Sequence, residues 1–213
     1  MTRIRAVVFD MDGVLIDAKE WHYEALNRAL GLLGHAISRY DHIATYDGLP
    51  TRKKLEMLSI ERGLPRELHA FINSLKQEFT LQIVHKECKP VFQHEFALSK
   101  LKADGMALAV ASNSVRASVE LMMARSNLLP YLDVVLSNED VERSKPDPQI
   151  FQVAMRRLGV APDETLVVED NPHGVEAARA SGAHVMVVQS PLDVVYDRIV
   201  ERIHAVESAG AAA

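Results

Sequence analysis

Residues 6–17 read AVVFDMDGVLID, a short apolar run followed at once by two aspartates that are one residue apart. Such a valine-rich run is typical of a strand that is buried on both faces of a parallel sheet. Asp10 and Asp12 then leave the carboxyl end of that strand together, and Gly13 permits a sharp turn behind them. Ligands bind outside this end of the strands in open parallel sheets. The stretch therefore predicts both a fold and a site, although an Asp-x-Asp pair alone also fits a solvated turn.

Four further apolar runs are predicted to be buried strands of the same sheet, at residues 107–111, 134–136, 166–168 and 185–188. Apolar residues at helical spacing lie between or after these runs, at residues 115–125, 149–158 and 174–180. The alternation of strand and helix predicts an α/β fold with a doubly wound, Rossmann-like parallel sheet.

The long interval between the first two strands contains helical patterns and no convincing strand. We expect helices over residues 19–33, 52–62 and 65–86, the first two ending near Gly34 and Gly63. The sequence therefore predicts a helical domain inserted at 16–89. The α/β core domain would comprise residues 1–15 and 90–213.

The composition excludes several classes of protein. The 213 residues are 48% hydrophobic and 25% charged, as in ordinary globular proteins. Their net charge of −5 argues against nonspecific binding of nucleic acid or anionic membranes. The single Cys88 cannot form an internal disulfide, and no apolar run approaches the roughly 18 residues of a membrane span. We expect a cytoplasmic protein, a monomer or weak dimer.

Polar residues also follow three of the other predicted strands. Ser112 and Asn113 come after the second, Lys145 follows the third after a short loop, and Glu169 and Asp170 come after the fourth. Each has a simple structural explanation: a helix cap, a solvated lysine and an exposed acidic turn. A phosphate-binding loop and a metal site are the functional alternatives.

Considered together, these residues predict phosphoryl transfer. Carboxylates without a histidine or thiol cluster favour Mg²⁺ over zinc or copper. A carboxylate that attacks a phosphate dianion meets like-charge repulsion, which a divalent cation and a lysine can offset. Transfer would then proceed through an aspartyl-phosphate.

These four motifs, in this order, resemble those of the haloacid dehalogenase superfamily, in the branch with a helical cap after the first strand. The resemblance implies that Asp10 is the nucleophile and that Asp12 is the general acid and base. It also implies that Ser112 and Asn113 hold the phosphoryl group and that Lys145 neutralises its charge. The metal ligands would be Asp10, Asp12 through its main-chain carbonyl, Glu169 and Asp170.

The inserted domain is similar to that of the β-phosphoglucomutase-like subgroup. Residues 17–22, which come after the first motif, match the sequence pattern of that subgroup. The resemblance implies that His22 meets Asp12 or the substrate, and that Arg52, in the segment Gly48–Arg52, binds a second phosphate or a sugar acid. A surface histidine and a solvated basic helix start are the alternatives.

The function expected from this resemblance is that of a Mg²⁺-dependent phosphatase acting on a small phosphorylated metabolite, a sugar or polyol phosphate. A sugar phosphomutase is the alternative, and a phosphoacceptor module without turnover is a third reading. In the resembled mutases a cap lysine works with the histidine at the His22 position. Counting without gaps places Thr80 there, with Lys76 one helical turn away. This departure favours hydrolysis over mutase chemistry.

Overall fold

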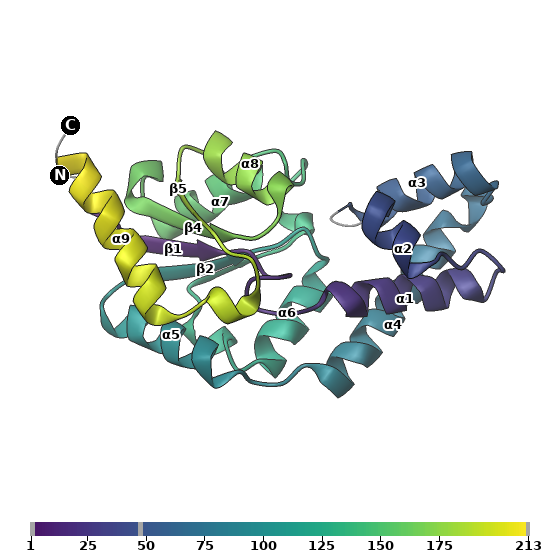
Figure 1. Cartoon of the computed structure of the whole chain (residues 1–213), viewed down its shortest axis with the longest axis horizontal. Coiled ribbons are helices and arrows are strands. Elements are labelled where there is room, and N and C mark those ends of the chain that lie inside the picture. Colours follow the sequence, from purple (N-terminus) through teal and green to yellow (C-terminus); the bar gives the residue numbers. More distant parts are fainter. Residues whose placement is uncertain (1–2, 47–48, 212–213) are drawn as a thin grey trace. The chain divides into compact units, whose positions relative to one another are not determined.

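The computed structural model describes residues 3–46 and 49–211. The chain divides into two compact units, one formed by Met1–Asp17 with Cys88–Ala213 and the other by Ala18–Glu87. We call them the sheet unit and the helical unit (Figure 1). Their boundaries fall two residues from the predicted ones. The residues 14–16 are buried together with the sheet residues.

The sheet unit is built on five parallel strands in the order β3-β2-β1-β4-β5. They are β1 (Ala6–Phe9), β2 (Ala107–Ala111), β3 (Val134–Leu136), β4 (Thr165–Glu169) and β5 (His184–Val187). The predicted doubly wound α/β fold is thus confirmed, with the strand bounds within one residue. β1 is fully buried between β2 and β4, which explains its unbroken apolar sequence.

Helices cover both faces of this sheet. Figure 1 shows α7 (Gln149–Leu158) and α8 (Pro172–Ala180) on one face, and α5 (Phe92–Ala103) and α9 (Tyr196–Ala211) on the other. The helix α6 (Arg116–Arg125) packs on β3. Short 3₁₀ turns are η3 (Leu129–Tyr131), η4 (Asn138–Asp140), η5 (Pro162–Glu164) and η6 (Pro191–Asp193).

Two of these helices, α5 and α9, were not predicted from the sequence. The apolar residues of α5 lie on more than one side, because Phe92 and Phe96 are exposed while His94 is buried beside Leu98. Such a helix has no clear apolar stripe, which is the pattern that a sequence-based assignment needs.

The helical unit contains α1 (Lys19–Gly31), α2 (Arg39–Asp41), α3 (Thr51–Arg62) and α4 (His69–Glu87). A π-helical turn, η1 (His42–Tyr46), and a 3₁₀ turn, η2 (Arg66–Leu68), complete it. The helix predicted at 19–33 is α1, which is two residues shorter than expected. The helix predicted at 65–86 corresponds to η2 followed by α4. The long helices α1 and α4 pack against each other. Residues from α1, α3 and α4 enclose a separate apolar core around Leu30, Leu58 and Ile72.

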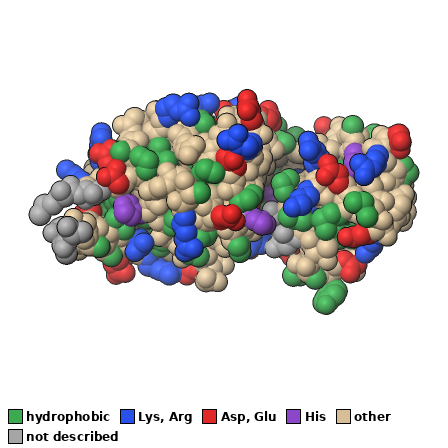
Figure 2. All heavy atoms as spheres, turned by 90° about the horizontal axis from the view of Figure 1, so that it is seen from above, with side chains coloured by type: hydrophobic (Ala, Val, Ile, Leu, Met, Phe, Trp, Pro, Cys, Tyr) green, Lys and Arg blue, Asp and Glu red, His purple; other side chains and the backbone are tan. Residues whose placement is uncertain are grey.

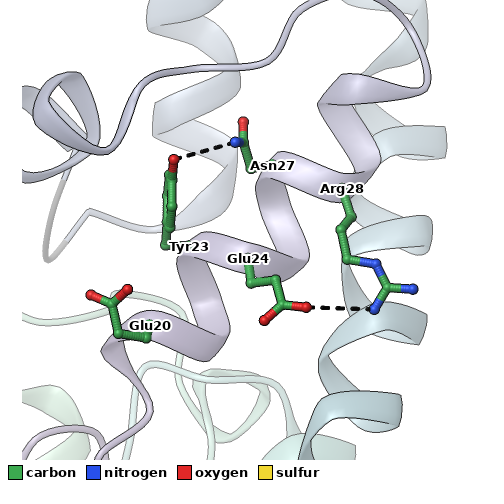
Figure 3. A pocket seen from close by; sticks show the side chains of 5 residues that line it. All are labelled: Glu20, Tyr23, Glu24, Asn27 and Arg28. Atoms are coloured by element: carbon green, nitrogen blue, oxygen red, sulfur yellow. Dashed lines mark hydrogen bonds and ion pairs between the residues drawn. The ribbon is translucent and has the colours of Figure 1, made fainter.

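A pocket on the surface of α1 is lined by Glu20, Tyr23, Glu24, Asn27 and Arg28 (Figure 3). The amide of Asn27 donates to the Tyr23 hydroxyl at 3.3 Å, and its oxygen accepts the N–H of Ile37 at 2.7 Å. These bonds tie the loop after α1 to the helix. The pocket lining is thus occupied by contacts that stabilise the helical unit itself.

Basic and acidic side chains are interspersed over the face drawn in Figure 2. On that face, neither the basic nor the acidic side chains form an extended patch. Among the helices of the described residues, none is both long and apolar enough to cross a bilayer.

Candidate active site

Parallel pairing brings the ends of β1, β2 and β4 to one edge of the sheet. The ladder continues beyond the strands, because the N–H of Asp10 donates to Val168 O at 2.9 Å and that of Ser112 to Leu136 O at 3.1 Å. Main-chain hydrogen bonds therefore fix the backbone at Asp10 and at Ser112. Their side chains start from rigid positions rather than from free loops.

A buried lysine joins two of the predicted carboxylates. The Nζ atom of Lys145 lies 2.6 Å from Asp10 Oδ1 and 2.6 Å from Glu169 Oε1. The three side chains are 4%, 10% and 1% exposed. The Lys145 ammonium also lies 4.7 Å from the centroid of the Phe151 ring. The structure thus brings together residues from three separate motifs, which are far apart in the sequence.

Burial and charge act on this group in opposite directions. Burial lowers the pKa of Lys145, but the carboxylates of Asp10 and Glu169 outweigh it and raise this pKa above its usual value. Burial raises the pKa of Asp10 well above its usual value; Lys145 opposes the change, and Glu169 and Asp12 add to it. The lysine therefore does not fully offset the burial of Asp10 and the charge of its neighbouring carboxylates, and a further cation would stabilise the ionised form of Asp10.

Three carboxylates at this edge could share such a cation. Oxygens of Asp10, Glu169 and Asp170 all lie within 4.8 Å of one another. Glu169 is held in place because its Oε2 accepts the N–H of Asp170 at 3.0 Å and that of Asn171 at 3.1 Å. The arrangement offers oxygen ligands from a rigid turn after β4.

Two glycines provide the space that these carboxylates occupy. Gly13 has a φ of 92°, and a Cβ atom added there would collide with the carboxylate of Asp170. A Cβ atom added to Gly174 in α8 would collide with the carboxylate of Glu169. The glycines therefore permit backbone and carboxylate to approach closely, as P-loop and turn glycines do.

Asp12 faces the turn after β2. Its Oδ2 accepts a hydrogen bond from Ser114 Oγ at 2.9 Å and a longer one from Ser112 Oγ at 3.4 Å. The N–H of Ser114 donates to Ser112 Oγ at 3.0 Å, which closes the turn. Ser114 was not among the predicted site residues. Its position two residues after Ser112, where a serine turn folds back, is the signal that could have identified it.

The side chain of Asn113 points to the lysine loop. Its Oδ1 accepts the main-chain N–H of Lys145 at 3.1 Å, and its Nδ2 donates to the Lys145 carbonyl at 3.4 Å. Sequence reasoning expected this amide to bind the phosphoryl group. The structure shows it bonded to the backbone of another site residue.

The other two predicted site residues, His22 and Arg52, belong to the helical unit. His22 Nδ1 lies 3.3 Å from Nζ of the buried Lys76. Arg52 is 90% exposed and pairs with Glu56 at 3.3 Å. Gly48, in the predicted specificity segment, lies outside the described residues.

The gapless count to Thr80 was wrong. The Thr80 hydroxyl donates to Lys76 O at 2.8 Å, so the two residues are one helical turn apart on the same side of α4. Lys76, and not Thr80, meets His22. The sequence argument that this chain departs from the mutases at this position therefore does not hold.

Comparison with known families decides the relationship. The family model described as haloacid dehalogenase-like hydrolase matches residues 7–188, which include the helical unit, most of the sheet unit and all four motifs. The chain belongs to this family. The expectation of a hydrolase of the haloacid dehalogenase type is thereby confirmed.

Relatives of this haloacid dehalogenase-like hydrolase include named phosphatases. A phosphorylated carbohydrates phosphatase of Thermotoga maritima is 32% identical over 187 residues, 84% of this chain and 82% of that protein. A fructose-1-phosphate phosphatase of Escherichia coli is 29% identical over 189 residues, 88% of this chain and 97% of that protein. The solved β-phosphoglucomutase of Clostridium difficile has a TM-score of 0.80, covers 95% of this chain and 98% of its own, and is 19% identical, so it supports the fold.

The residues of this hydrolase fit a hard divalent cation. The donor set around Asp10, Glu169 and Asp170 consists of carboxylate oxygens, which Mg²⁺ and Ca²⁺ prefer and which zinc and copper sites seldom use alone. Burial raises the pKa of Asp10, and a bound cation would lower this pKa by stabilising the ionised carboxylate. Gly13 and Gly174 leave room for the carboxylates.

Proposed function

We propose that the chain is a Mg²⁺-dependent phosphatase that hydrolyses a small phosphorylated metabolite, a sugar or polyol phosphate, through an aspartyl-phosphate on Asp10. The observation that carries this proposal is the contact of Lys145 Nζ with both Asp10 and Glu169 at 2.6 Å. This contact supports the proposal because it joins the proposed nucleophile Asp10, the ammonium of Lys145 and the candidate metal ligand Glu169. The named carbohydrate and fructose-1-phosphate phosphatases support the substrate class.

The reaction divides into two displacements at phosphorus. A carboxylate oxygen of Asp10 attacks, the bond from phosphorus to the ester oxygen breaks, and Asp12 gives that oxygen a proton. Water then attacks phosphorus and gives a proton to Asp12, the bond from phosphorus to the Asp10 oxygen breaks, and inorganic phosphate leaves with the Asp10 carboxylate restored. Ser112 would donate a hydrogen bond to the phosphoryl oxygens, and Lys145 would offset their charge throughout.

The cation would be held by Asp10, Glu169, Asp170 and the main-chain carbonyl of Asp12. When bound, it would supply positive charge to the equatorial oxygens of the phosphoryl group. Ser112, the expected phosphoryl contact, and Ser114 in the same turn both donate to Asp12. Arrival of an anion at this turn would therefore compete with Asp12 for the hydroxyl groups and favour its rotation toward the leaving group.

Asp12→Asn is expected to slow hydrolysis of alkyl phosphates much more than that of p-nitrophenyl phosphate. Only a poor leaving group needs a proton from Asp12, an effect worth about 100-fold or more. The measurement is kcat/KM for a sugar phosphate and for p-nitrophenyl phosphate in both proteins. Equal losses for the two substrates would deny Asp12 the role of general acid.

We propose that the helical unit acts as a specificity cap, with His22 and Arg52 contacting the part of the substrate beyond the transferring phosphoryl group. Arg52→Ala and His22→Ala should raise KM for the physiological metabolite about 10-fold or more, and that for p-nitrophenyl phosphate less than about 3-fold. Steady-state kinetics with both substrates measure this. An unchanged KM and kcat for the metabolite in both variants would remove these residues from the specificity site.

A sugar phosphomutase is the second candidate, and the contact between His22 and Lys76 favours it. A mutase and a phosphatase would share the first displacement and differ in whether sugar or water accepts the phosphoryl group. Incubation with a hexose 1-phosphate, a trace of hexose bisphosphate and Mg²⁺ separates them. Hydrolysis predicts inorganic phosphate as the main product, whereas faster formation of hexose 6-phosphate would establish the mutase.

The proposed function is tested by phosphate release from a panel of phosphorylated sugars, polyols and organic acids. We expect turnover of sugar or polyol phosphates with Mg²⁺ and loss of turnover when the metal is removed by a chelator. Release that persists undiminished without metal would contradict the metal dependence. No release from any phosphate ester would contradict the function itself.

A further inference from the structure

The loop that carries Lys145 needs a point of attachment. Lys145 lies between η4, which ends at Asp140, and α7, which begins at Gln149, and it belongs to neither a strand nor a helix. A lysine side chain is a flexible four-carbon stem. The position of its ammonium therefore depends on where the loop places the main chain, and both contacts of 2.6 Å depend on that position.

Asn113 supplies that attachment by two bonds to one residue. Its Oδ1 accepts the N–H of Lys145 at 3.1 Å, and its Nδ2 donates to the carbonyl of the same residue at 3.4 Å. The Asn113 amide thus bonds both the N–H and the carbonyl of the same residue. Two such bonds fix the orientation of the main chain at Lys145 as well as its position, as pairing with a neighbouring strand would. Asn113 itself follows Ser112, whose N–H extends the pairing of β2 with β3. The clamp thus connects the lysine loop to the rigid edge of the sheet.

We propose that Asn113 is a positioning residue for Lys145, whose amide sets the location of the lysine ammonium between Asp10 and Glu169. This inference rests on the proposed function, in which that ammonium offsets the charge of the transferring phosphoryl group. It assigns the amide to the backbone of Lys145 instead of to the substrate. Asn113 then affects the reaction through the lysine, and its loss should reduce turnover more than substrate binding.

The kinetic test compares Asn113→Ala, Lys145→Met and the double variant, using p-nitrophenyl phosphate with Mg²⁺. A displacement of about 1 Å in a catalytic group can cost about 100-fold. We expect Asn113→Ala to lower kcat by about 10-fold to 100-fold and to change KM less than about 3-fold. In the Lys145→Met background the same substitution should change kcat less than about 2-fold, because there is no ammonium left to misplace.

Gln149→Ala is the matched control. Gln149 Oε1 accepts the N–H groups of Glu142 and Arg143 in the same loop at 3.1 Å and 2.9 Å. Its loss removes two loop hydrogen bonds without releasing the backbone of Lys145. We expect less than about a 3-fold change in kcat. A loss equal to that of Asn113→Ala would show general loosening of the loop and would overturn the assignment.

A measurement that needs no turnover keeps the two proposals separate. The NMR signal of the Lys145 ammonium, assigned by its disappearance in Lys145→Met, should shift or broaden in Asn113→Ala and remain in place in Gln149→Ala. Asn113→Leu, which keeps the approximate side-chain volume and loses both the donor and the acceptor without adding charge, should give the same change, and it replaces Asn113→Ala if that variant fails to fold. An unchanged ammonium signal in both Asn113 variants would overturn the positioning role. So would a rise in KM that persists in the Lys145→Met background. If the wild-type protein hydrolyses no phosphate ester, the proposed function fails, while the NMR result still decides the role of Asn113.

Discussion

Asp10→Asn is expected to fold normally and to lose more than about 1,000-fold of the turnover of every phosphate ester that the wild-type protein hydrolyses. An amide nitrogen or oxygen does not attack phosphorus, and a neutral amide is a poor ligand for a hard cation. The loss should therefore be the same for good and poor leaving groups. This distinguishes it from the loss caused by Asp12→Asn.

The thermal stability of Asp10→Asn provides a second test that does not depend on turnover. Burial raises the pKa of Asp10, so a neutral amide removes the desolvation of a charged carboxylate. The same substitution removes one of the two carboxylate partners of Lys145 Nζ, which keeps its 2.6 Å contact with Glu169. Because these effects oppose each other, the midpoint of thermal unfolding without metal should stay close to that of the wild-type protein. Asp163→Asn, on an exposed 3₁₀ turn, is the control and should retain full activity. Substantial activity in folded Asp10→Asn would contradict the proposal that Asp10 is the nucleophile.

Gly174→Ala is expected to damage the site without changing any polar group. The added methyl group would overlap the carboxylate of Glu169, so either this side chain or the start of α8 must move. Overpacking of this kind lowers the free energy of unfolding by about 1–3 kcal/mol. Displacement of Glu169 also breaks its contacts with Lys145 Nζ and with the N–H groups of Asp170 and Asn171. The affinity for Mg²⁺ should fall about 10-fold or more.

Chemical unfolding, and titration with Mg²⁺ by calorimetry, measure the two effects. Gly31→Ala is the matched control, because Gly31 is also helical and an added Cβ there would meet open space. It should be neutral or stabilise the protein by about 0.5–1 kcal/mol. Wild-type stability and Mg²⁺ affinity in Gly174→Ala would show that Glu169 does not hold the place assigned to it.

The sequence was sufficient to predict the sheet because its central strands, β1, β2 and β4, are buried. Their apolar runs could not be mistaken for amphipathic surface elements, and the polar residue after each run marked the edge where the site lies. The approach of Lys145 to Asp10 could be expected only in outline. Parallel strands bring these residues to one edge, whereas the 2.6 Å contact also depends on the loop before α7.

Within the candidate site, the features that the sequence did not predict depend on side-chain direction and not on element type. Asn113 was expected to bind the phosphoryl group and Ser114 was not predicted as a site residue; their contacts with Lys145 and Asp12 arise from the conformation of a turn that has no periodic pattern. The pairing of His22 with Lys76 was missed for a related reason. A helix repeats its faces every turn, so counting without gaps from a distant strand is uncertain by one turn.

The central claim is that the phosphoryl group resides on Asp10 between the two displacements. It is tested most directly by quenching the enzyme during turnover with Mg²⁺ and substrate, reducing any acyl phosphate with borohydride, and mapping the product by mass spectrometry. The account predicts homoserine at position 10 in the wild-type protein and none in Asp10→Asn. Homoserine at another aspartate, or an unmodified Asp10 under conditions where phosphate release is fast and the intermediate accumulates, would contradict it.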